Sequence, residues 1–199
     1  MSFSSWLRNW KRSIERRWAL HQTLPRKSSV RQSAARLRLE SLEDRYLLST
    51  YYVTSTADDG SPGTLRDAIN QVNQGLYNEI DFNIGAVGSA QTIYVGDSGL
   101  GGLPNLQASG VYINGLSQGG SGNTFALSIE LQGTYAGATS GLTLGQSNCT
   151  VSGLIIDNFQ GSGIVDYGHN NLIGGEAVAG NVLSENGQVG LECGSGDLA

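Results

Sequence analysis

The chain has 199 residues and a formal net charge of −5, but this average joins two unlike parts. Residues 1–50 hold eleven of the twelve Lys and Arg and carry a net charge of +7, whereas residues 51–199 carry −12 and all 29 glycines. The acidic part lacks the clustered basic side chains that phosphate binding needs, so we expect no nucleic-acid partner. No apolar run approaches the ~18 residues that span a bilayer. The composition predicts a basic leader joined to an acidic folded body.

The basic leader, residues 1–50, places aromatic and aliphatic side chains at steps of four: Trp6, Trp10, Ile14 and Trp18. On a helix these residues form an apolar stripe beside a cationic face, which suits an anionic membrane surface. The alternative is a flexible leader with transient helix, which we favour because isolated helices of this length are marginal in water. A secretory signal would add ~7–15 apolar residues, and these are missing.

The end of the leader carries a recognisable motif, "RLRLESLEDRYLLST", at residues 36–50. It resembles the leader motif Arg-Leu-x-Leu-Glu-x-Leu-Glu-Asp-Arg-x-Leu-Leu-Ser, which precedes many extracellular proteins of planctomycete bacteria. The resemblance implies export or display at the cell surface. It also implies that the leader contacts export machinery or the membrane surface.

The residue pattern over 51–77 predicts a strand followed by a helix that covers the end of the body. Tyr51–Thr54 has the β-branched and aromatic content of a strand. Thr64 and Asp67 form a capping box, and Gly75 stands where a left-handed glycine ends a helix. One apolar face follows the 3.6-residue period, at Leu65, Ala68, Ile69 and Val72.

Three charged residues surround this helix start. Asp58 and Asp59 could suggest calcium, but we interpret them as a solvated turn before a helix N-terminus, where negative charge is favourable. Arg66 is interpreted as a surface residue of the first helical turn rather than a catalytic base.

From residue 78 onward the sequence is a series of short β segments that end in Gly, Asn or Ser, as strands and turns require. The segments are EIDFNIG, QTIYVG, GVYING, ALSIELQG, GLTLG, CTVSGLIID, GIVDYG, NLIGG, NVLSEN and VGLECG.

A shift of 27 residues superimposes two of these segments, with Ile155 on Val182 and Ile164 on Leu191. Short strands that repeat without helices are typical of one turn of a parallel β-helix. We therefore predict an all-β fold, a right-handed parallel β-helix (solenoid) over residues 78–199, with an incomplete C-terminal end. An antiparallel β-sandwich is the alternative. The helix at residues 64–75 favours the solenoid, whose open end needs a cover.

A second motif, "GSPGTLRDAINQVNQG", followed by "EIDFNIG", resembles the CSLREA-like N-terminal module of bacterial extracellular right-handed β-helix proteins. The later segments resemble the repeats of the same proteins. The resemblance implies the fold and an extracellular setting. It implies no single activity, because the family includes adhesin-like, binding and polysaccharide-degrading proteins.

The two cysteines, Cys149 and Cys193, lie 44 positions apart, near two turns of the predicted solenoid. Two strand spacings of ~4.8 Å put their Cα atoms beyond the reach of a disulfide. We expect free, mostly buried thiols.

The acidic body offers little catalytic chemistry. A polysaccharide lyase needs a basic side chain and a cation for the developing charge, yet no Lys or Arg follows Arg66. A hydrolase needs clustered carboxylates. His169 is interpreted as an exposed corner residue rather than as part of a catalytic element. The remaining acids are Asp157, Asp166, Glu185 and Glu192.

The 27-residue register places Glu185 beside Asp157, where two carboxylates could share a Ca²⁺ ion. Solvated outward-facing acids are the alternative, and no other cofactor is expected. The sequence thus favours an extracellular binding or structural module that contacts polysaccharide or the cell envelope. The alternative is the N-terminal part of a polysaccharide lyase or glycoside hydrolase of the pectin-lyase-like β-helix type.

Overall fold

A computed structural model describes residues 49–120, 127–175 and 180–194. The chain divides into two units, residues 1–43 and 44–199, and the described residues all belong to the second. The basic segment with its apolar stripe at residues 6–18 and most of the leader motif at 36–50 lie outside the described residues. Neither helix within the described ranges has the length and apolar character that a membrane span requires.

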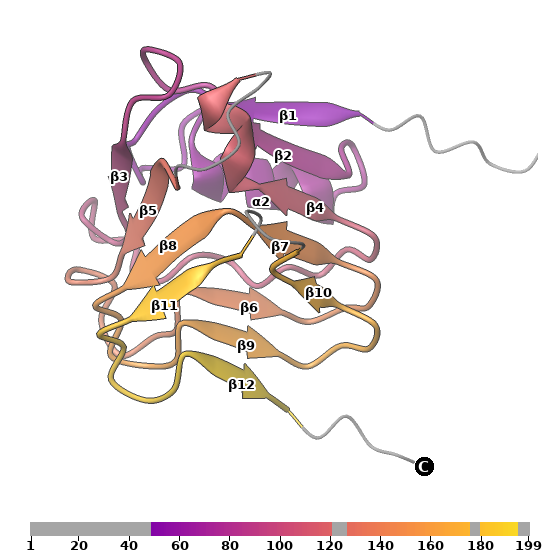
Figure 1. The fold of residues 1–199 in the computed structure, drawn as a ribbon, viewed down its shortest axis with the longest axis vertical. Helices are drawn as coiled ribbons and strands as arrows, with labels where there is room; N and C mark the ends of the chain where they lie inside the picture. The colour runs from indigo at the N-terminus through magenta and orange to yellow at the C-terminus, as the bar shows by residue number, and fades with distance from the viewer. Residues whose placement is uncertain (1–48, 121–126, 176–179, 195–199) are drawn as a thin grey trace, which may run out of the picture. The chain divides into compact units, whose positions relative to one another are not determined.

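The body is built of short strands in three sheets, and every strand pairs in parallel with its neighbours (Figure 1). Sheet A contains β1 (Thr50–Val53), β2 (Glu79–Phe82), β4 (Tyr112–Asn114), β7 (Thr150–Ser152) and β10 (Leu172–Ile173). Sheet B contains β3 (Gln91–Tyr94), β5 (Ile129–Gln132), β8 (Leu154–Asp157) and β11 (Val182–Ser184). Sheet C contains β6 (Leu142–Leu144), β9 (Ile164–Asp166) and β12 (Leu191–Cys193).

These strands confirm the segments expected from the sequence. Each predicted segment contains a strand, and CTVSGLIID contains two, β7 and β8, separated by Gly153. The first strand begins at Thr50 rather than Tyr51, and the preceding Ser49 N–H already donates to the side chain of Asn78. The folded body therefore begins slightly before the expected boundary at residue 50.

From β4 onward the chain visits sheets A, B and C in the same order three times, as β4–β6, β7–β9 and β10–β12. Ile155 pairs with Val182 and Ile164 with Leu191, which confirms the 27-residue register. The preceding spacings differ, at 25 residues from Ile129 to Leu154 and 22 from Leu142 to Ile164. Parallel pairing throughout the described strands rules out the antiparallel sandwich for them and is compatible with a solenoid.

The core lies between the sheets and is filled by alternate strand residues. In sheet B, Ile93 pairs with Leu131, and Leu131 pairs with Ile156, and all three are fully buried. Because strand side chains alternate between faces, in-register pairing aligns the inward residues of successive strands. The helix contributes Leu65, Ala68, Ile69 and Val72 to the same core.

The helix α2 (Leu65–Asn73) forms as expected and packs against β1 and β2, the first strands of sheet A. Thr64 caps it by accepting a hydrogen bond from the Asp67 N–H, and Gly75 follows with φ +74°. The reciprocal half of the capping box is absent from the described contacts. The Asp67 carboxylate instead accepts hydrogen bonds from Tyr51 Oη and Gln71 Nε2, so it ties the helix to β1.

A 3₁₀ helix, η1 (Gly115–Gly119), was not expected from the sequence. Its buried Gln118 donates to the carbonyl of Ile84 and accepts from the N–H of Ile84, and Ser117 Oγ accepts from the N–H of Phe82. These side chains bond to the backbone at the end of β2 and just after it, beyond the last residue of β2 that pairs with β4. The periodicity of apolar residues does not predict this 3₁₀ helix or its bonds to the backbone, because the bonds come from polar side chains.

Asparagine side chains join the corners of successive repeats. Asn181 accepts from the N–H of Leu154 and donates to the carbonyl of Val151, while Asn186 accepts from the N–H of Phe159 and donates to the carbonyl of Ile156. Asn171 accepts in the same way from the N–H of Cys149. Asparagine also occupies left-handed corners, whose backbone conformation it tolerates better than most residues do, at Asn148, Asn158 and Asn170.

The interpretation of Asp58 and Arg66 as solvated residues was wrong, whereas Asp59 is exposed as expected. Asp58 is completely buried and Arg66 nearly so, with Nε to Oδ1 at 2.9 Å and Nη2 to Oδ2 at 2.6 Å. The guanidinium also donates to the carbonyls of Gly101 and Gly102, and the carboxylate accepts from the N–H of Gly96. These partners come from a loop more than thirty residues away, which the local sequence around the turn does not reveal.

Removing one member of this pair leaves a buried charge without its partner. We expect Asp58→Ala to lower the free energy of unfolding by about 3–5 kcal/mol, measured by urea denaturation. Asp59→Ala is the matched control, because this neighbouring carboxylate is exposed and bonds only within its own turn to Ser61. An unfolding midpoint for Asp58→Ala equal to that of Asp59→Ala would contradict the stabilising role of the pair.

Candidate functional site

The outward face of sheet B brings polar side chains from four strands into line. Pairing places Tyr94 beside Gln132, Gln132 beside Asp157, and Asp157 beside Ser184. Neighbouring strands lie ~4.8 Å apart, so the four side chains form a regular column along the sheet. A second column runs parallel to the first, through Thr92, Glu130, Ile155 and Val182.

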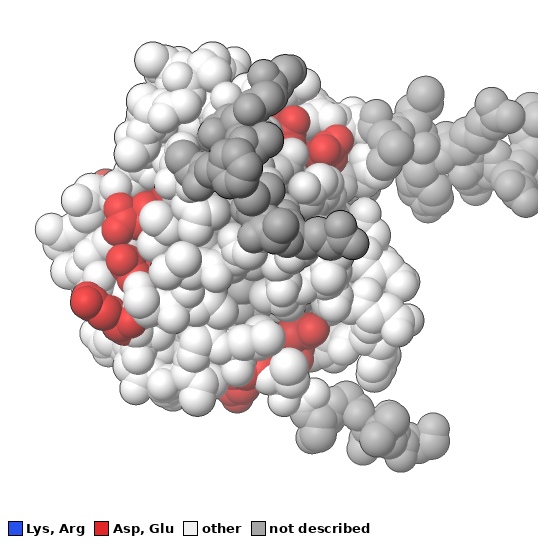
Figure 2. All heavy atoms as spheres, in the orientation of Figure 1, with Lys and Arg blue, Asp and Glu red and all other residues white. Residues whose placement is uncertain are grey.

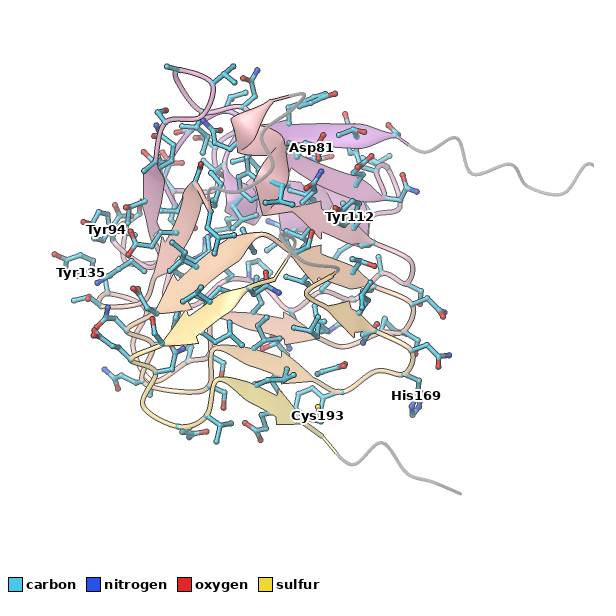
Figure 3. All side chains as sticks on the ribbon, in the orientation of Figure 1. Asp81, Tyr94, Tyr112, Tyr135, His169 and Cys193 are labelled. Carbon is cyan, nitrogen blue, oxygen red and sulfur yellow. The ribbon has the colours of Figure 1, made fainter. Side chains whose placement is uncertain are left out.

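Two tyrosines lie together at one end of this face. The rings of Tyr94, at the end of β3, and Tyr135, in the loop after β5, have centroids 6.1 Å apart and planes inclined at 59°. Their exposed fractions are 45% and 58%, which is high for rings that already contact each other. Figure 3 shows both side chains projecting from the same side of the molecule. The pair therefore offers two aromatic surfaces to solvent.

The backbone holds this tyrosine pair in place. Gly96 lies directly against the turn that carries Tyr135, because a Cβ on Gly96 would come within 2.4 Å of the Tyr135 carbonyl oxygen. Gly96 also has φ +83°, a backbone conformation that favours glycine. Its N–H donates to the buried Asp58 carboxylate. The loop after β3 is thus held in place both by the ion pair and by the turn that carries Tyr135.

Three carboxylates lie near one another on this face: Glu130 within β5, Asp157 at the end of β8 and Glu185 just after β11. Burial raises the pKa of Asp157, and the nearby carboxylates of Glu130 and Glu185 raise it further. Thr92 Oγ1 donates to Glu130 at 2.6 Å, which holds that carboxylate against the sheet. The Oδ1 atom of Asp157 is buried and has no hydrogen-bond partner among the described residues.

The predicted calcium ligands Asp157 and Glu185 are therefore brought close enough to interact electrostatically. Glu185 follows β11 with φ +55°, and Asn158 follows β8 with φ +57°, so the two residues occupy equivalent corners. Across the described ranges, no three His, Cys, Asp or Glu side chains converge in a geometry suited to a metal ion. Calcium binding by Asp157 and Glu185 remains a prediction.

The other acids of the predicted cluster lie on sheet C. Asp166, at the end of β9, accepts from the N–H of Gly168 and from Asn171, which is the bonding pattern of a structural corner. Glu192 in β12 accepts from Ser162 Oγ. His169 is exposed, as expected, and Figure 3 places it on the opposite side of the view from the tyrosine pair. These residues do not contribute to the face of sheet B.

The described surface offers no free Lys or Arg side chain to a ligand. Arg66 is the only Lys or Arg among the described residues, and its guanidinium is buried against Asp58. Figure 2 accordingly shows Asp and Glu but no Lys or Arg on the face of the molecule that it displays. An anionic ligand would therefore meet only repulsive charges on this part of the chain.

Sheet A presents a second polar face, which differs from that of sheet B. Tyr52, Asp81, Asn114 and Ser152 pair in register along it. Burial, followed by the charge of Glu79, raises the pKa of Asp81, but Asn114 Nδ2 donates to this carboxylate. Asp81 therefore has a partner where Asp157 Oδ1 has none, and no other aromatic ring of the described residues pairs with Tyr52.

Sequence reasoning missed Glu130 and the tyrosine pair. Alternation within ALSIELQG marks Glu130 as outward-facing, but only the 25-residue spacing of β5 and β8 places it near Asp157. Tyr94 and Tyr135 meet because β3 pairs with β5 across 38 positions, a spacing with no counterpart in the 27-residue repeat. Because these spacings differ from 27 residues, the repeat in the sequence did not predict either feature.

No protein-family model matches this chain, and no curated protein matches it significantly.

The cysteines are free, as expected, but only Cys149 is buried, and the expectation of burial was wrong for Cys193. Cys193 lies in β12, the edge strand of sheet C, and among the described residues only β9 pairs with it. Burial raises the pKa of the Cys149 thiol. The two thiols should therefore differ sharply in reactivity, because the thiolate is the reactive form.

We expect a thiol reagent at neutral pH to label one cysteine quickly in the native protein and the second only after denaturation. Cys193→Ser should remove the fast phase, and Cys149→Ser should remove the slow one. A native protein with no reactive thiol before reduction would contradict the assignment of two free cysteines.

The raised pKa of Asp157 gives a pH dependence of stability. Since the folded state binds this proton more tightly than the unfolded state, the stabilising contribution is complete below the unfolded value of 3.8 and is lost as pH rises through the folded value. The melting temperature of Asp157→Asn relative to wild type should therefore increase with pH across that window.

Asp59→Asn provides a control of opposite sign. Hydrogen bonds from Ser61 lower the pKa of Asp59, so its contribution is present above 3.8 and is lost as pH falls. The melting temperature of this variant relative to wild type should fall with increasing pH. A difference between Asp157→Asn and wild type that stays constant with pH would show that Asp157 is not perturbed.

Proposed function

We propose that the described residues form a right-handed parallel β-helix, covered at its N-terminal end by α2, whose role is to bind glycans. The repeated order of sheets A, B and C supports the solenoid. Right-handed crossovers between parallel strands are nearly universal, which supports the handedness. The buried apolar face of α2 supports the covering role, because it packs on the first strands of sheet A.

We also propose that the protein is exported. The support is the leader motif at residues 36–50, with its resemblance to leaders of extracellular planctomycete proteins. A setting outside the cell would bring the polar faces into contact with extracellular polysaccharide or with components of the cell envelope.

The observation that carries a binding role is the absence of a free Lys or Arg side chain in the described part of the chain. Arg66 uses its donors on Asp58, Gly101 and Gly102 and is buried. Elimination from a uronate sugar needs a base and a positive group to stabilise the charge that develops next to the carboxylate. The described residues supply no such positive group, so a lyase would need residues outside them.

A glycoside hydrolase is the second candidate, and Asp157 is the observation that favours it. A carboxyl group with a raised pKa beside a second carboxylate is the arrangement of a general acid and its partner. Asp157 and Glu130 meet this condition on the face of sheet B. Glu130 and Asp157 lie one and two strands away from the strand of Tyr94 on the same face, so a sugar chain bound along this face would pass both carboxylates.

The experiment that tests these roles presents the full-length chain with polysaccharides of neutral, anionic and cationic types and follows two signals. We expect retention on at least one immobilised polysaccharide and no release of reducing ends or unsaturated products. Release of reducing ends that disappears in Asp157→Asn would establish the hydrolase instead. Failure to retain any polysaccharide would contradict a role in glycan binding.

A further inference from the structure

The face of sheet B combines two features that recognise sugars. Tyrosine has a flat apolar ring with a hydroxyl at its rim, and a sugar has a face of C–H groups with hydroxyls around its edge. Tyr94 and Tyr135 provide two such rings at a centroid distance of 6.1 Å, both well exposed. Gln132 Nε2 and Oε1 bond to Thr134, which fixes the amide beside the rings.

The same face is negatively charged and holds an unused acceptor. Asp157 lies two strands from Tyr94 in the same column, and its Oδ1 atom is buried without a partner. Glu130 and Glu185 lie close to it on the neighbouring strands or corners. A positively charged group from a ligand would relieve the repulsion among these carboxylates.

Charge decides which sugars fit this face. A polyuronate carries one carboxylate per residue and would meet Glu130 and Asp157 without any free Lys or Arg among the described residues. An amino sugar has the same ring with an ammonium group. It can stack its C–H face on tyrosine and present its cation to a carboxylate or to the aromatic ring.

We propose that the outer face of sheet B binds a polysaccharide of amino sugars, with Tyr94 and Tyr135 stacking on sugar rings and Asp157 and Glu130 receiving the ammonium groups. This inference rests on the proposed glycan-binding function and names its site and ligand class. Acidic plant-type polysaccharides are excluded as ligands of this face.

The test measures binding of the full-length chain by calorimetry to three oligosaccharides of equal length. One is a β-1,4-glucosamine oligomer, the second is its fully N-acetylated counterpart, and the third is an oligogalacturonate. The glucosamine oligomer should bind best at a mildly acidic pH that keeps its amines charged. The acetylated oligomer should bind about tenfold more weakly because its amide carries no charge, and the oligogalacturonate should not bind.

Variants on sheet B are compared with matched variants on other sheets. Tyr94→Ala, Tyr135→Ala and Asp157→Asn should each weaken binding of the glucosamine oligomer by about three- to tenfold. Tyr94→Phe should retain binding because it keeps the ring. Tyr52→Ala and Asp81→Asn on sheet A are the controls, with similar side chains in a different place, and should bind as wild type does.

Each contrary outcome has a distinct meaning. Equal affinity for the amino and acetylated oligomers would overturn the charge-based ligand class but leave glycan binding intact. Loss of affinity in Tyr52→Ala and not in Tyr94→Ala or Tyr135→Ala would overturn the assignment to sheet B. Binding of none of the three oligomers, together with no retention on any polysaccharide, would overturn both this inference and the proposed function. Circular dichroism of each variant separates loss of a contact from loss of the fold.

Discussion

In-register parallel pairing is the constraint on which the rest of the structure depends. Inward aliphatic residues such as Ile93, Leu131 and Ile156 stack because their strands pair at the same positions. A shift of one residue would turn this whole set toward solvent, so burial of the apolar face fixes the register strongly. The same pairing aligns the outward residues as well. The column that contains Tyr94 and Asp157 is therefore a direct consequence of how the core packs.

The corners allow this register to persist although the connections differ in length. Side-chain amides of Asn181 and Asn186 bond to backbone groups of the preceding repeat in β7, in β8 and just after β8. Gly153 makes the sharp corner between β7 and β8 with φ +74°, and a Cβ there would lie 2.8 Å from the backbone nitrogen of Leu116. Because hydrogen bonds between repeats hold these corners, a longer loop such as the one that carries Tyr135 can leave the paired strands undisturbed.

Electrostatics separates the inside of this body from its surface. The one basic side chain of the described residues is used internally, where Arg66 joins Asp58 to a distant loop and to the glycine that positions the tyrosine pair. The surface is left with carboxylates and neutral groups. Where carboxylates meet, as at Asp157, burial and neighbouring charge raise the pKa. Because Arg66 is used in the buried ion pair, no Lys or Arg of the described residues balances the carboxylates that a ligand encounters.

The sequence by itself determined the strands, their alternation, the capped helix and the register that joins Ile155 to Val182. These features are local or recur at a fixed spacing, so the periodicity of apolar residues and the positions of Gly and Asn suffice to predict them. Part of the candidate site followed as well, because the 27-residue shift placed Glu185 near Asp157.

Only the tertiary structure decided the remaining features: the burial of Asp58 and Arg66, the exposure of Cys193, the proximity of Glu130 to Asp157 and the contact between Tyr94 and Tyr135. Each of these depends on which strands or loops lie beside one another, and that in turn depends on connection lengths that vary from one repeat to the next. A polar side chain carries no periodic signal of its partner. Its environment is set by the fold that the apolar residues build around it.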